Sequence, residues 1–233
     1  VWPKGRQEEM NLFVGFRTKF ERPASGEAEL RIAGVSVYRL FLNGKFVGYG
    51  PARGPHGYYR VDKWVLRGLH EGKNFVAIEA AGYNVNSYSL VDEPAFIQAE
   101  IVSDGKVIAS TGGKGAEFEA CILTERLQKA QRYSSQRTFT EYYRMKADQG
   151  KWRIYKEESF ERAECEKVGD KKLLPRRITY PEFFKRQPVT FLCEGTVETG
   201  VEVGKLWKRK ELTAVGPKLK GYKQEELEVI PSI

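Results

Sequence analysis

The chain has 233 residues, enough for one large β domain or for one domain and the start of another, and its 41% hydrophobic and 30% charged residues are an ordinary globular composition. The net charge of +8 is spread evenly, because residues 1–150 carry 21 Lys and Arg against 17 Asp and Glu while residues 151–233 carry 18 against 14. A nucleic-acid interface would concentrate this excess, and no helix-turn-helix, zinc-finger or RNA-binding signature is present. We therefore expect no nucleic-acid partner.

The sequence also argues against a membrane or metal partner. No apolar run approaches the length of a membrane span, and the first ten residues lack the apolar stretch of a signal peptide. Cys121, Cys165 and Cys193 form no even disulfide framework, and their spacing, with only two histidines, predicts no metal site. These features slightly favour the cytoplasm over secretion, but they leave the compartment open because a leader can be removed.

The clearest local signal is a hairpin over Tyr38–Pro51. β-Branched and aromatic residues lie on both sides of Asn43-Gly44, the dipeptide that best tolerates the positive φ values of a type I′ turn. The strand pair leads into a glycine-rich loop that contains Arg53 and His56. We interpret the glycines Gly48, Gly50, Gly54 and Gly57 as turn residues, because no phosphate-loop spacing and no following helix accompany them.

Short strands separated by turn signals continue along the chain. A second hairpin is predicted at Asp104-Gly105, and one or two helical turns are expected at Glu125–Arg132. The other expected strands are Leu12–Phe20, Ala28–Ala33, Tyr58–Leu66, Asn74–Ala81, Ala95–Val102, Lys106–Ser110, Phe118–Leu123, Thr138–Met145 and Trp152–Tyr155. With no long helices between the strands, a parallel α/β sheet is excluded, and we predict an all-β fold: a two-sheet antiparallel β-sandwich, with a jelly roll as its candidate topology.

The last part of the chain has a different pattern. We expect a β-sandwich accessory domain over residues 1–170. Residues 171–233 are predicted to be an extended linker and the start of a further, truncated β domain, since Pro181 disfavours helix before it and strand-like stretches follow in Thr190–Val203. Glu225–Ile230 has the pattern of a strand with no partner after it, so we expect the chain to be part of a longer protein.

A self-contained catalytic site is not indicated. A Ser-His-Asp arrangement would require His56 with residues such as Asp62 and Ser87, and no nucleophile elbow accompanies them. The carboxylates that a glycosidase would need are present, but their positions on strands or at loop edges are those of ordinary structural residues. These carboxylates are Asp62, Glu79, Asp92, Glu93 and Glu100.

A binding site is better indicated by two irregular loops that could emerge at the same end of the sandwich. Their aromatic rings offer apolar faces while amide and guanidinium groups bond hydroxyls in fixed directions, which suits a sugar. The alternative is that tyrosines such as Tyr58, Tyr83 and Tyr88 only pack beneath the loops. The candidate carbohydrate-binding residues are Arg53, His56, Tyr59, Tyr83, Asn84, Asn86 and Tyr88.

Several segments resemble the N-terminal region of bacterial α-L-rhamnosidases and related glycoside hydrolases. They are WPKG from Trp2, FRTKF at Phe16–Phe20, YRLFLNGKFVGYGPARGP at Tyr38–Pro55, VDKWVLRGLHEGKNFVAIEA at Val61–Ala80 and QRYSSQRTFTEYYRM at Gln131–Met145. The resemblance extends over about two thirds of the chain. It implies a galactose-binding-like jelly roll that precedes a catalytic (α/α) barrel, for which this sequence contains no helical hairpins.

The resemblance therefore implies a non-catalytic accessory region of an enzyme that removes terminal rhamnose from glycans. Its expected partners are a rhamnose-containing glycan and the downstream catalytic domain of the same polypeptide, with no cofactor. No catalytic residue can be carried over from the family. The alternative is a protein-interaction β-sandwich without sugar affinity, which an exposed apolar patch would favour.

Overall fold

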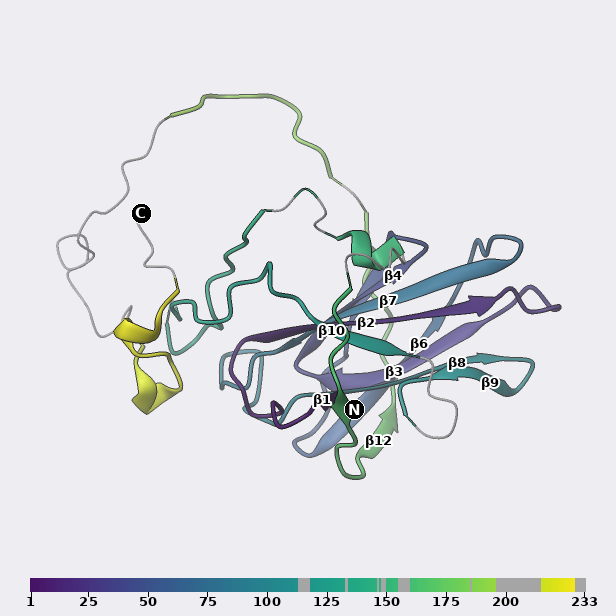
Figure 1. Ribbon diagram of the computed structural model, residues 1–233, viewed down its shortest axis with the longest axis horizontal. Helices are drawn as coiled ribbons and strands as arrows, with labels where there is room; N and C mark the ends of the chain where they lie inside the picture. The colour runs from purple at the N-terminus through teal and green to yellow at the C-terminus, as the bar shows by residue number, and fades with distance from the viewer. Residues whose placement is uncertain are drawn as a thin grey trace.

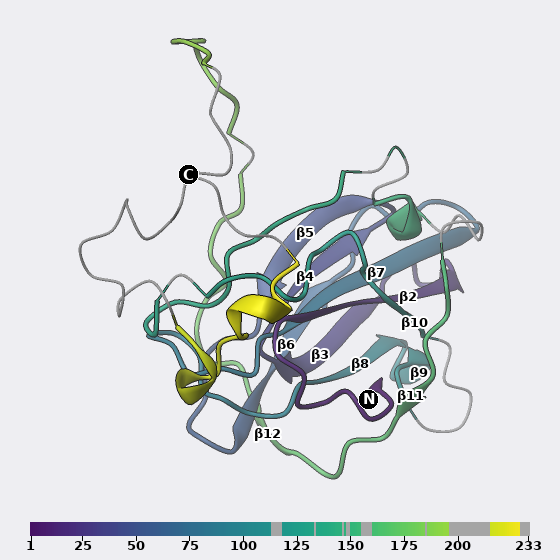
Figure 2. The same ribbon diagram turned by 60° about the vertical axis from the view of Figure 1, so that its left-hand side comes forward.

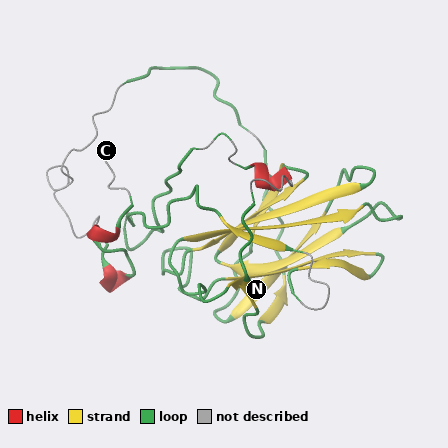
Figure 3. Ribbon diagram, in the orientation of Figure 1, coloured by secondary structure: helices red, strands yellow, loops and turns green. Residues whose placement is uncertain are grey.

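Two five-stranded β-sheets stacked face to face form the main body of the molecule (Figures 1 and 3). The computed structural model describes residues 1–112, 118–132, 134–145, 147, 150–154, 160–184, 186–195 and 215–228. Within these ranges the only helices are single 3-10 turns, η1 (Lys151–Ile154), η3 (Pro217–Leu219) and η4 (Gln224–Glu226). The prediction of an all-β antiparallel sandwich is confirmed, while its description as a jelly roll remains a prediction.

The first sheet is antiparallel throughout. Its strands, in spatial order, are β10 (Glu119–Ile122), β2 (Leu12–Glu21), β7 (Lys73–Gly82), β4 (Val37–Leu42) and β5 (Lys45–Gly50). The predicted hairpin forms its β4–β5 edge, and Asn43 and Gly44 both have positive φ, 50° and 77°. The tight turn thus has the backbone conformation that its sequence predicts.

The second sheet differs from the expectation in one strand. Its order is β12 (Lys172–Pro175), β6 (Tyr58–Val65), β3 (Glu29–Val35), β8 (Phe96–Ser103) and β9 (Lys106–Ser110). The pairing of β12 with β6 is parallel, with Leu173 opposite Tyr59, whereas the other pairs are antiparallel. A separate two-residue ladder joins β1 (Trp2–Pro3) to β11 (Cys165–Glu166). Residues 172–175, predicted to lie in a linker, therefore belong to the sandwich, while the division of the chain at residue 170 stays a prediction.

The core lies between the sheets because alternate residues of each strand point inward. Fully buried side chains from both sheets meet there, including Phe16, Leu30, Leu40, Ile78 and Ile101. Each such side chain contributes about 1.5–3 kcal/mol by leaving water.

The outer face of the first sheet is also covered. Phe13, Phe41 and Ala77 point away from the main core and pack with Phe139 and Trp152, which lie on the segment after β10. Gly15 of β2 makes room for this cover, since a Cβ there would lie 2.9 Å from the Trp152 ring. The sequence from 123 to 154 therefore adds a second, smaller apolar cluster to the fold.

The expected elements in this covering segment are wrong. Residues 125–132 form turns, bends and isolated bridges, because the buried Arg126 pairs with Glu79 of β7 and bridges to Tyr143, contacts made by the fold and not by local sequence. Only isolated bridges occur in 138–145, and residues 151–154 form η1 in place of a strand. The two predicted tail strands are not formed in their described parts, since residues 190–195 have no strand and η4 occupies 224–226, while residues 196–203 and 229–230 lie outside the described residues.

At the end of the hairpin, Gly48 and Gly50 are needed for a reason other than turn geometry. A Cβ on Gly50 would lie 2.1 Å from Asp62 Oδ2 and 2.5 Å from Tyr38 Oη, and one on Gly48 would lie 2.4 Å from the Trp64 ring. Both lie inside β5, so the interpretation of these two as turn residues was wrong. They allow buried side chains to approach the backbone closely.

Residues after β12 continue along the sandwich before they leave it. Arg176 Nη1 donates to Asp62 Oδ1 over 3.0 Å, and Asp62 also accepts from the Tyr38 hydroxyl. Tyr180 lies with its ring centroid 4.3 Å from that of Trp64, and Phe183 lies 5.0 Å from Tyr49. Residues 186–195 then arch away from the sheets (Figures 1 and 2).

Candidate functional site

The two predicted loops meet in one groove. One runs through residues 51–57 after the cis Gly50–Pro51 bond, and the other runs through residues 83–95 between β7 and β8. Together with the corner between β3 and β4 they enclose a groove of about 400 Å³. This volume is within the range of small-molecule sites in proteins.

Four of the seven predicted residues line this groove: Arg53, His56, Tyr59 and Tyr88. Tyr58, which the sequence placed in the same loop, lines it too. Tyr88 is 73% exposed, so its ring is an open aromatic face at the margin of the groove. Arg53 lines the same groove, is exposed and offers up to five hydrogen-bond donors.

Glu93 connects the two loops. Its carboxylate lies 3.3 Å from His56 Nε2 and accepts a bond from the Gly57 amide over 3.4 Å. Burial raises the pKa of Tyr59 to about 12, and a hydrogen bond to Glu93 and its negative charge add to this effect. Sequence reasoning considered Glu93 only as a possible catalytic carboxylate, because its contacts with residues 56–59 depend on the fold.

The second loop is held in shape by its own serines. The Ser87 hydroxyl accepts bonds from the amides of Ser89 and Leu90 over 3.2 and 3.1 Å. The Tyr88 amide donates to the Gln136 carbonyl over 3.1 Å. Tyr88 therefore presents its ring from a backbone that is fixed at two points.

The structure does not bring Tyr83, Asn84 and Asn86 into the groove. Tyr83 is 8% exposed and packs edge-on against Phe13, with ring centroids 5.8 Å apart, and burial raises its pKa to about 12. Asn84 adopts a φ of 49° and donates to the carbonyls of Gln7 and Glu9 over 2.7 and 2.8 Å.

Asn86 is exposed outside the groove, and its Oδ1 accepts from the Asp92 amide over 3.0 Å. Tyr83 and Asn84 fix the start of the loop to the body of the protein, and Asn86 braces the loop internally. The polar sequence of the loop predicted exposure, but β7 continues to Gly82 and carries the next two residues into buried positions.

The two most deeply buried carboxylates are both neutralised. Glu79 is paired with three arginines: Arg39 at 2.5 Å, Arg126 at 2.7 Å and Arg153 at 2.7 Å. Asp62 is bound by Arg176 and Tyr38 inside the sandwich, so it does not join His56 and Ser87. Each pairing compensates a buried charge, so that removing one partner would be costly, and it leaves neither carboxylate available as an acid or base.

Two further site types were searched for over the described part of the chain. No group of three or more His, Cys, Asp or Glu side chains there is arranged to hold a metal ion. In the same residues no helix has the length and apolar character needed to cross a membrane.

Comparison with known proteins gives a solved structure with the same fold. No protein-family model matches the sequence, and no curated protein matches it. The GH78 family rhamnosidase of Bacillus sp. GL1 aligns with 77% of this chain at 28% identity and a TM-score of 0.65. The α-L-rhamnosidase of Streptomyces avermitilis, complexed with L-rhamnose, aligns with 70% of the chain at 17% identity and a TM-score of 0.46.

These matches cover only a small part of each rhamnosidase. This chain spans 20% of the Bacillus enzyme and 16% of the Streptomyces enzyme. A lectin from Pleurotus ostreatus also aligns, with 52% of this chain and 34% of the lectin, at 22% identity and a TM-score of 0.38. The resemblance to α-L-rhamnosidases that the sequence predicts is confirmed: the fold of this chain is similar to that of a β-rich part of a GH78 rhamnosidase.

Proposed function

We propose that this chain is a non-catalytic, carbohydrate-binding accessory region of an α-L-rhamnosidase-like glycoside hydrolase. The observation that carries the proposal is the meeting of two loops, about 30 residues apart in sequence, in one groove with Arg53, His56, Tyr59 and Tyr88 on its walls. The similarity to the Bacillus rhamnosidase at 28% identity supports the enzyme class. The parent enzyme would remove terminal rhamnose from glycans in a domain outside this chain.

The chemistry of the groove suits a short saccharide. Tyr88 offers an exposed ring for the C–H face of a sugar, and Arg53 donates to its hydroxyl groups. Glu93 is 14% exposed and holds His56 and the Gly57 amide, so the polar wall keeps its shape without ligand. A wall that is already ordered reduces the entropy lost on binding.

Calorimetric titration with L-rhamnose and with rutinose, a rhamnose-containing disaccharide, tests this proposal. We expect binding that is weakened by Tyr88→Ala and by Arg53→Ala. Val107→Ala is a matched control, because Val107 is also exposed, at 54%, but lies on β9 away from the groove. No heat with either sugar would contradict the binding role.

A packing role without sugar affinity is the second candidate, and a specific feature favours it. Apolar side chains are exposed along the arch that leaves the sandwich: Val189 at 99%, Phe191 at 75% and Leu192 at 89%. Isolated exposed apolar residues are ordinary, but a run of them is typical of a surface that another domain covers. We propose that this segment contacts the downstream catalytic domain.

A further inference from the structure

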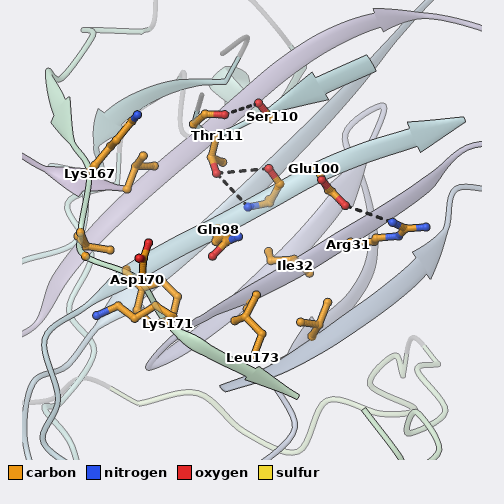
Figure 4. Close-up of a pocket in the computed structure, with 18 residues that line it drawn as sticks. Arg31, Ile32, Gln98, Glu100, Ser110, Thr111, Lys167, Asp170, Lys171 and Leu173 are labelled. Atoms are coloured by element: carbon orange, nitrogen blue, oxygen red, sulfur yellow. Dashed lines mark hydrogen bonds and ion pairs between the residues drawn. The ribbon is translucent and has the colours of Figure 1, made fainter. Parts of the chain in front are cut away.

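A second hollow lies on the outer face of the second sheet and borders the groove, since Leu173 in its lining pairs with Tyr59 of the groove. It has a volume of about 560 Å³ and shares no lining residue with the groove. Its floor is formed by β3 and β8, and one wall is formed by residues 167–171, which connect β11 to β12, together with Leu173 of β12 (Figure 4).

The register of two strands builds the floor. Arg31 lies opposite Glu100 and Ala33 lies opposite Gln98, so these four side chains share the outer face. Arg31 closes one end, donating to Glu29 over 2.9 Å and to Glu100 over 3.3 Å. Because the Ala33 side chain is small, the outer surface of the sheet is recessed at the position beside Gln98.

The wall is anchored at both ends. Leu173 belongs to β12 and is held by parallel pairing with β6, while Val168 packs on the buried cluster of Ala33, Val35 and Phe96. Lys171 Nζ lies 5.0 Å from the Phe96 ring centroid, a cation–π contact that holds the middle of the wall. The wall is therefore attached to the second sheet at its ends and in its middle.

Three polar side chains at this hollow have no partner among the described residues: Gln98, Lys167 and Asp170. Figure 4 shows Gln98 and the Asp170 carboxylate toward the middle of the hollow. Lys167 lies at the margin of the hollow. The Thr111 hydroxyl, in contrast, is fully used, since it accepts from the Ala99 amide over 2.9 Å and donates to the Ala99 carbonyl over 3.3 Å.

We propose that this hollow is a second binding site, for a short neutral saccharide. Sugar hydroxyls both donate and accept, and the three side chains offer an acceptor in Asp170, donors in Lys167 and both kinds in Gln98. Val168 and Leu173 provide an aliphatic surface for the C–H groups of the sugar ring. The cations Arg31, Lys167 and Lys171 are balanced by Asp170, by Glu100 and by Glu29, which accepts from Arg31, so the lining has no excess charge that would favour an anion over a neutral ligand.

This site goes beyond the proposed groove and does not depend on it. Phe96 is fully buried, so the hollow lacks the open aromatic ring that Tyr88 gives the groove, and we expect weaker binding there. Two sites on one rigid sandwich would increase the retention of a polymeric glycan by avidity.

Nuclear magnetic resonance titration of the whole chain with rutinose tests the proposal. We expect amide shifts at residues 98–100 and 167–171 as well as in the groove. Gln98→Ala and Asp170→Ala should each weaken association at the hollow about fivefold, the loss expected for one hydrogen bond. Both residues are exposed, so these variants should fold, and Gln187→Ala on the exposed arch is the matched control.

The pattern of shifts separates the two proposals. Shifts confined to residues 51–59 and 87–93 would overturn the second site and leave the groove standing. Shifts confined to the hollow would support the second site and count against the groove. Tighter binding of digalacturonate than of rutinose at the hollow would overturn its assignment to a neutral saccharide.

Discussion

At the scale of single residues, the buried Glu79 must be neutralised for the fold to be stable. Its side chain is 3% exposed and that of Arg126 is 5% exposed, and the two lie 2.7 Å apart. Glu79→Gln would leave Arg126 buried with only Glu141 as a counter-ion, so we expect a loss of about 3–5 kcal/mol in the free energy of unfolding. Urea denaturation followed by circular dichroism measures this loss.

The control for that variant is an exposed ion pair. Lys4 and Glu164 lie 3.1 Å apart with side chains 61% and 75% exposed, and Glu164→Gln should change stability by less than about 1 kcal/mol. Equal effects of the two variants would contradict a special role for Glu79.

The same residue predicts a pH dependence of stability. Burial by itself would raise the pKa of the Glu79 carboxyl, but Arg39, Arg126 and Arg153 together hold it below its usual value of 4.5. A lowered pKa in the folded state gives stability that is fully present above 4.5 and is lost as the pH falls through the folded value. We expect the unfolding free energy to decrease below about pH 4.5, less steeply in Glu79→Gln, in denaturation curves recorded at several pH values.

At the scale of elements, Arg176 attaches β12, the edge strand of the second sheet that it directly follows, to the core. Its side chain is 8% exposed and Asp62 is fully buried, so Arg176→Ala would leave a buried carboxylate bonded only to Tyr38. We expect a loss of about 3–5 kcal/mol in stability. Hydrogen exchange should accelerate at residues 172–183, because β12 and the residues after it lose their main attachment.

The neighbouring arginine is a matched control for this prediction. Arg177 is exposed and makes none of these contacts with Asp62, so Arg177→Ala should leave both stability and exchange unchanged. Faster exchange spread evenly over all strands, without a maximum at residues 172–183, would show that Arg176 has no local role.

The sequence predicted elements that local chemistry determines. Asn43-Gly44 and Asp104-Gly105 formed turns at the predicted positions, since both asparagine and aspartate reach positive φ there, 50° and 48°. The segment 123–154 was mispredicted because its order comes from packing on a sheet formed by distant residues. Asn84 shows the same limit, as its amide bonds to Gln7 and Glu9 lie 77 and 75 residues away in the chain.

At the scale of the whole molecule, segments far apart in sequence complete the sandwich. The Tyr222 hydroxyl donates to the Met10 carbonyl over 2.6 Å, and Arg144 pairs with Glu228 at 3.2 Å. Residues 215–228 therefore pack on the covering segment and the N-terminal part, just as residues 172–183 pack on β6 of the second sheet and β5 of the first. A division of the chain at residue 170 would separate groups that contact each other.

This packing can be tested with two shortened chains that end at residues 170 and 195. Both lack residues 215–228, so they differ only in the segment that contains Arg176, Tyr180 and Phe183. Trp64 is 7% exposed and is covered by the Tyr180 and Phe183 rings at 4.3 and 6.2 Å, so the chain ending at 170 should expose it to water. We expect a lower melting temperature and red-shifted tryptophan fluorescence for that chain. Identical melting curves would instead favour an independent sandwich over residues 1–170, because the later segment would then contribute nothing to its stability.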